Sequence, residues 1–265
     1  MTANRKDSGI TSAVIAEAIY AAVLARRVIN REVLPRTGTK ELFSYPSFVR
    51  FYVPLVATML LSLSTVTLIS AALARMPDSL ASLAAWPVAF GFLMFWQSPA
   101  FGFQEVVISL LRREQGLRVL TRVTQAIVLG MSALLLLVSL TPLATLWFIH
   151  GAALSPELTQ LAWSTLLLGL LIPGLRTLQS WLQGAIVFGG ETRSMMESVI
   201  VFVLVTSGIL AFGIFTGTYK GIHVGMVAYV LGMAAQTAWL AWRAQPLFGT
   251  LRRRDEPAFA TEGGI

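Results

Sequence analysis

Six runs of mainly apolar residues, each more than 20 residues long, constrain most strongly what this chain can fold into. A helix that crosses a hydrocarbon core of ~30 Å needs about 20 such residues. The chain of 265 residues is 55% hydrophobic and 12% charged, against roughly 25% charged residues in an average soluble domain. We therefore predict an all-α, polytopic membrane helix bundle with spans at 51–74, 81–111, 117–142, 158–187, 195–215 and 222–242.

The basic residues indicate how such a bundle would be oriented. Seventeen of the 20 Lys and Arg residues fall in connections that would share one side of the membrane, two fall on the other side, and Arg176 lies within a span. Cytoplasmic loops retain Lys and Arg. We predict a multi-pass protein of the cell inner (plasma) membrane with both termini in the cytoplasm. The net charge of +7 then reflects sidedness, and we expect no nucleic-acid partner.

The chain divides on composition into three predicted parts. Residues 1–48 form a cytoplasmic N-terminal segment with a helix, 49–243 a six-helix transmembrane lobe, and 244–265 a disordered cytoplasmic tail. The stretch AEAIYAAVLARR, residues 16–27, is similar to AAQTAWLAWRAQ, residues 234–245, which closes the sixth span. The N-terminal helix is therefore either the remnant of a further span or an amphipathic helix on the membrane surface.

The fourth span has a well-defined predicted start. In SPEL, Ser155 suits the N-cap, Pro156 the first helical position and Glu157 the first turn. A serine side chain there satisfies a free backbone N–H, and the helix dipole favours the glutamate.

A first polar stripe interrupts the second span. Gln97 and Gln104 are seven residues apart and lie within about 20° of each other on a helix, with Glu105 beside them. Pro99 adds a free carbonyl on the preceding turn. An ionised carboxylate facing lipid is disfavoured by several kcal/mol. Glu105 is either a proton- or cation-responsive group in a cavity, or a glutamate near enough to the membrane surface to reach arginines or headgroups.

A second polar stripe lies in the fourth span. Arg176, Gln179 and Gln183 follow the spacing i, i+3, i+7 and share one helix face. The guanidinium could bind an anionic substrate group through its fork of donors, pair with Glu105 or Glu197, or snorkel to the interface. Glu197 itself suits a cap in the first turn of the fifth span.

Signatures of chemistry are missing from the sequence. There is no cysteine and there are only two histidines, so we predict no metal site and no cofactor. HExxH, GxSxG, GxxxxGK[ST], GxGxxG and EF-hand motifs do not occur. We expect that the protein is not an enzyme.

Residues 50–243 resemble the multidrug/oligosaccharidyl-lipid/polysaccharide (MOP) flippase superfamily, in its multidrug and toxin extrusion (MATE)-like or progressive-ankylosis-like branch. The similarity lies in Pro54-Leu55 after a basic residue and Phe, in LAAWPVAFGFL, and in the Leu-Gln…Gly turn that leads to Thr192-Arg193 and a GxxxG-led closing helix. These are patterns of helices and turns.

The resemblance implies a transporter that works by alternating access, ion-gradient coupled as in an antiporter. Family members join two six-helix lobes, whereas this chain has one. The resemblance therefore implies a second lobe as partner, supplied by a homodimer or by a separately encoded half. The substrate would be a small molecule or a lipid-linked compound, amphipathic or anionic. In this hypothesis Gln97, Gln104 and Glu105 supply the coupling surface, and Arg176, Gln179 and Gln183 bind substrate. The alternative is a non-transporting membrane subunit or a truncated half-transporter.

Overall fold

The computed structural model describes residues 15–26, 45–113, 116–190 and 193–255. The chain divides into two compact units, residues 1–50 and 51–265. In the first unit, residues 15–26 form a helix, and its side chains are exposed, including Ile19 and Tyr20. An exposed apolar face is expected both of a span remnant and of an amphipathic surface helix, so both interpretations remain predictions.

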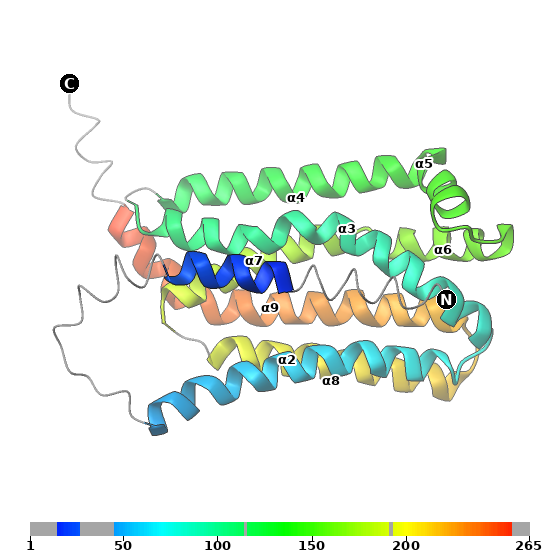
Figure 1. Ribbon diagram of the computed structural model, residues 1–265, viewed down its shortest axis with the longest axis horizontal. Helices are drawn as coiled ribbons and strands as arrows, with labels where there is room; N and C mark the ends of the chain where they lie inside the picture. The colour runs from blue at the N-terminus through cyan, green and yellow to red at the C-terminus, as the bar shows by residue number, and fades with distance from the viewer. Residues whose placement is uncertain (1–14, 27–44, 114–115, 191–192, 256–265) are drawn as a thin grey trace. The chain divides into compact units, whose positions relative to one another are not determined.

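All regular structure among the described residues is helical, as the sequence predicts (Figure 1). Five helices are long and apolar enough to cross a membrane, and the pair α6 and α7 would make a sixth if it is one broken span. The elements are α2 (Tyr45–Leu73), α3 (Ser79–Leu111), α4 (Gly116–Leu140), α5 (Pro142–Leu146), the π-helical turn η3 (Trp147–Gly151), α6 (Pro156–Leu168), α7 (Ile172–Phe188), α8 (Arg193–Thr216) and α9 (Gly221–Asp255).

The core of the second unit is built from contacts between consecutive helices and between helices far apart in the chain. The most extensive contacts join α8 to α9 and α3 to α7, and α7 also packs against α4 and α9. The main apolar cluster includes Leu73, Leu93 and Met226, contributed by three different helices. Helix α7 therefore packs mainly against α3, α4 and α9, and its side chains reach two separate hollows described below.

The predicted fourth span is bent in the structure. It is interrupted at residues 169–171, and α6 and α7 meet at an angle of 42°. Pro173 stands in the first turn of α7, where its missing N–H and fixed φ favour a new helix start. A Cβ on Gly169 would lie 2.6 Å from Leu93 Cδ1, so this position also allows close approach of α3. The predicted N-cap is confirmed, since Ser155 Oγ accepts a hydrogen bond from the Leu158 N–H at 3.4 Å.

The last helix continues beyond the predicted end of the sixth span. Residues 245–255, expected to be disordered, are helical and belong to α9. Leu251 is 4% exposed, and the guanidinium of Arg254 donates to the carbonyls of Leu111 at 3.0 Å and Arg113 at 3.3 Å. These contacts hold residues 245–255 against the rest of the bundle. Periodicity alone does not reveal them. Residues 256–265 lie outside the described part of the chain.

Candidate functional site

A cavity of about 370 Å³ lies among α2, α3, α7, α8 and α9. We call it the central cavity. Most of its residues stand away from the ends of their helices, as Gln97 does in α3 and Gln236 in α9. Its wall combines aromatic and aliphatic side chains with a group of polar ones. The polar members are Thr58, Ser62, Thr65, Gln97, Arg176, Gln179, Gln183, Tyr229 and Gln236.

Arg176 provides the positive charge of the cavity wall. It lies in the second turn of α7, just after the break from α6. The guanidinium carbon is 4.7 Å from the centre of the Phe101 ring, a distance at which the ring face attracts a cation. Nη1 donates to Gln179 Oε1 at 3.4 Å, whereas Nε is buried without a hydrogen-bond partner.

No carboxylate among the described residues lies within ion-pair distance of Arg176. Glu197, one predicted partner, instead contacts Arg193 at 3.2 Å and Arg243 at 3.4 Å. Glu105, the other predicted partner, is exposed. The guanidinium is therefore half-buried with neutral neighbours, which is an environment that favours binding of an external anion.

A chain of hydrogen bonds continues from Arg176 through three helices. Gln179 Nε2 donates to Gln236 Oε1 at 3.2 Å and to the Met233 carbonyl at 3.2 Å. Gln236 Nε2 donates to Ser198 Oγ at 3.4 Å. This glutamine network, Gln179 with Gln236 and Ser198, joins α7, α9 and α8 and fixes the orientation of the amide that accepts from Arg176.

The remaining glutamines of the wall are held less tightly. Gln97 is 2% exposed, yet Nε2 has only two long contacts, to the Leu93 carbonyl at 3.5 Å and to Met94 Sδ at 3.4 Å. Gln183 is 9% exposed and lies one helical turn beyond Gln179. Both side chains can offer donors and acceptors to a solute in the cavity.

The structure brings four of the six predicted site residues together and separates the other two. Gln97, Arg176, Gln179 and Gln183 all line the central cavity. Gln104 is half-buried and Glu105 exposed, and neither belongs to the cavity wall. The reason lies in α7, because the ideal Cβ position of Gly184 is 3.0 Å from the Gln104 carbonyl oxygen. The two helices touch there and close the space that a continuous stripe would have lined.

Several wall residues were not predicted. Tyr229 and Gln236 are seven residues apart on α9, and Thr58, Ser62 and Thr65 follow helical spacing on α2. The same periodicity test that found Gln179 and Gln183 detects these stripes. The α2 hydroxyls are easily passed over because they suit a helix in lipid: Ser62 donates to the Thr58 carbonyl and Thr65 to the Leu61 carbonyl, each at 2.9 Å.

A second polar contact lies apart from the central cavity. Ser164 Oγ and His223 Nε2 are 2.8 Å apart and join α6 to α9. Ser164 also donates to the Leu161 carbonyl at 2.9 Å. Among the described residues there is no group of three or more His, Asp or Glu side chains that could hold a metal ion.

No protein-family model, curated protein or solved structure matches the chain. The resemblance to the MOP flippase superfamily therefore stays a prediction.

Proposed function

We propose that the chain is one lobe of a membrane transporter of the MOP flippase type, which moves an anionic or amphipathic solute by alternating access. In this proposal α6 and α7 form a single broken span, so the lobe has six, and both termini lie in the cytoplasm. The observation that carries it is the central cavity, where a half-buried arginine with no carboxylate partner in the described part of the chain stands among glutamines and aromatic rings.

The chemistry of the wall supports an anionic group on the solute. The guanidinium can donate two parallel hydrogen bonds to a carboxylate or phosphate. The broken span adds a second favourable contribution, because the positive end of the α7 dipole lies within two turns of Arg176. Transporters built from repeats commonly place such helix breaks at their substrate sites.

The same wall supports an apolar portion on the solute. Phe90 and Phe202 each meet the Tyr229 ring edge to face, with centroids 5.0 and 5.6 Å apart. Trp86 stacks on Phe90 at 5.3 Å. Aromatic surface beside a single cation suits an amphipathic anion better than a small inorganic one.

A partner lobe is part of the proposal. Repeat-built transporters place the site between two halves near the bilayer midplane. The central cavity would then be half of a complete site, and a homodimer or a separately encoded half would supply the rest. Ion coupling would fall to Glu105, which is exposed and would face this partner.

The test is flux of carboxyfluorescein, a fluorescent amphipathic anion, through vesicles that contain the purified full-length chain. Arg176→Gln should lower the initial rate by about tenfold or more, the value of one or two charge-assisted hydrogen bonds. Gln104→Ala, on α3 but outside the cavity wall, is the matched control and should keep the wild-type rate. Glu105→Gln should remove the dependence of flux on a proton gradient.

Three results would count against the proposal. Wild-type vesicles no faster than protein-free ones would exclude transport by a homodimer, which leaves a separately encoded second lobe or the alternative of a non-transporting membrane subunit. Equal rates for wild type and Arg176→Gln would remove the substrate assignment. Faster flux of a cationic dye such as rhodamine 6G than of carboxyfluorescein would reverse the predicted charge of the solute.

A further inference from the structure

A second hollow, separate from the central cavity, lies where α4 begins and α9 ends. It measures about 440 Å³. We call it the end pocket, and define it by Leu117, Arg118 and Arg122 of α4, Trp181 of α7, and Phe248 and Arg252 of α9. Trp181 is two residues from Gln179 and from Gln183, so α7 presents one face to each hollow.

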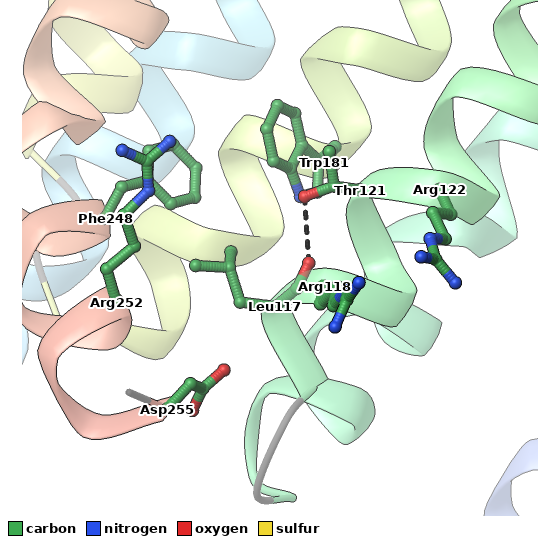
Figure 2. A pocket seen from close by; sticks show the side chains of 8 residues that line it. All are labelled: Leu117, Arg118, Thr121, Arg122, Trp181, Phe248, Arg252 and Asp255. Carbon is green, nitrogen blue, oxygen red and sulfur yellow. Dashed lines mark hydrogen bonds between the residues drawn. The ribbon is translucent and has the colours of Figure 1, made fainter. Parts of the chain in front are cut away.

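The inner surface of the end pocket is apolar. Trp181 and Phe248 are stacked, with centroids 5.0 Å apart and an angle of 26° between the rings. Leu117 lies between the α4 and α9 arginines in Figure 2. The indole N–H of Trp181 is buried without a hydrogen-bond partner. An aromatic wall of this kind suits an acyl chain.

The outer rim of the end pocket is cationic. Figure 2 shows Arg252 on one side and Arg118 and Arg122 on the other, from two helices that are far apart in sequence. All three side chains are exposed. The acidic residue of the lining, Asp255, is 8% exposed and its Oδ1 accepts from Arg254 at 3.0 Å, so this carboxylate is paired with an arginine outside the lining.

The shape of the rim is set by hydrogen bonds. Arg254 holds the last turn of α9 against the end of α3, through the Leu111 and Arg113 carbonyls. Thr121 Oγ1 donates to the Leu117 carbonyl at 2.8 Å in the first turns of α4. The end of α9 that carries Arg252 is therefore held in place before a ligand arrives, which lowers the entropy lost on binding.

We propose that the end pocket binds one anionic phospholipid, with its phosphodiester between the arginines and an acyl chain along Trp181 and Phe248. Helices long enough to cross a membrane end at this pocket, and in this proposal the pocket lies at the depth of the headgroups. Guanidinium groups bind phosphate bidentately. A basic pocket between such helices, with an aromatic inner wall, is the chemistry that lipid headgroups require.

The test measures lipid bound to the purified full-length chain in detergent, by native mass spectrometry, with dioleoylphosphatidylglycerol and dioleoylphosphatidylcholine as probes. The wild type should bind the anionic lipid more tightly. The triple variant Arg118→Ala, Arg122→Ala, Arg252→Ala should lose about fivefold in affinity for each arginine removed. The matched control, Arg75→Ala, Arg112→Ala, Arg253→Ala, removes the same charge from exposed positions outside the pocket and should keep the wild-type affinity.

A second variant separates the pocket from its charge. Thr121→Trp fills the end pocket with every arginine retained, and should weaken binding of the anionic lipid as well. Equal affinity for both lipids, equal loss in the two triple variants, or unchanged binding in Thr121→Trp would overturn the proposal. Displacement of the lipid by micromolar glycerol 3-phosphate would also overturn it, because the ligand would then be a soluble phosphate.

Discussion

The central cavity and the end pocket use the same side-chain types in opposite environments. The cavity has one half-buried arginine among neutral amides, whereas the pocket has three exposed arginines around an aromatic wall. Removing a cation from water is costly, so a single half-buried guanidinium must be compensated by specific contacts. The charges of exposed guanidinium groups are screened by salt, so several of them are needed to bind an anion. The comparison indicates selective binding in the cavity and cumulative, less selective binding in the pocket.

The largest expected effect follows from replacing the buried cation. Arg176→Met replaces the arginine by an apolar side chain of similar length. It removes a charge that has no carboxylate partner among the described residues. We expect the free energy of unfolding to rise by about 1–3 kcal/mol while carboxyfluorescein flux is lost. Thermal unfolding in detergent would show the stability change.

Arg252→Met is the control for this experiment, because Arg252 is exposed. Its melting temperature should stay at the wild-type value. A fall in stability for Arg176→Met would mean that the guanidinium stabilises the fold, and the contrast between the two hollows would be lost.

Helices α3 and α7 pack closely at Gly184. A Cβ on Gly184 would lie 2.8 Å from Val107 Cβ and 3.0 Å from the Gln104 carbonyl oxygen. Gly184→Ala should therefore destabilise the protein by about 1–3 kcal/mol. Gly130→Ala, at an exposed helical glycine with no atom within 4 Å of its ideal Cβ position, should be neutral or slightly stabilising. Equal melting temperatures for the two variants would contradict tight packing at Gly184.

The glutamine network should contribute less. Gln236→Leu removes the acceptor for Gln179 Nε2 and the donor to Ser198. Hydrogen bonds between membrane helices are worth about 0.6 kcal/mol on average, so we expect a loss of about 1 kcal/mol for the two. Chemical unfolding would measure it, with Gln104→Leu as control. A loss as small as that of the control would show that the network orients Arg176 without stabilising the bundle.

The smallest expected effect concerns the arginines of the end pocket. Arg252→Ala should leave the melting temperature unchanged in phosphatidylcholine nanodiscs, because exposed ionic contacts contribute little. In phosphatidylglycerol nanodiscs the wild type should be stabilised relative to the variant, by about 1 kcal/mol. A difference that is the same in both lipids would mean that Arg252 acts within the protein and not on the headgroup.

Helix positions were largely predictable because hydrophobic length is a local property. The described α3, α4, α8 and α9 begin within a few residues of the predicted starts of their spans. The 42° bend between α6 and α7 falls inside the predicted span 158–187, and hydrophobic length does not reveal it because the close approach of Leu93 to Gly169 comes from another helix. The extension of α9 to Asp255 was missed for the same reason, because its partners are carbonyls of α3.

The candidate site was predictable where one helix carries it. Arg176, Gln179 and Gln183 share a face of α7, and all three line the cavity. The prediction for α3 included Gln104 and Glu105, which do not line the cavity. Helical periodicity cannot show that α7 approaches α3 closely at Gly184 and closes the space beside Gln104. Gln236 shares a face of α9 with Tyr229, which periodicity can detect, but its hydrogen bond to Gln179, 57 residues away in sequence, is visible only in the tertiary structure.

The sequence by itself determined that the chain is helical and apolar enough to cross a membrane, and which side chains on each helix are polar. Composition and periodicity are sufficient for this, because hydrocarbon thickness and the 3.6-residue repeat act on one helix at a time. The tertiary structure decided which polar side chains share a cavity and which arginines share a pocket. Those groupings depend on how closely neighbouring helices approach, and glycines and carbonyls on different helices set that distance.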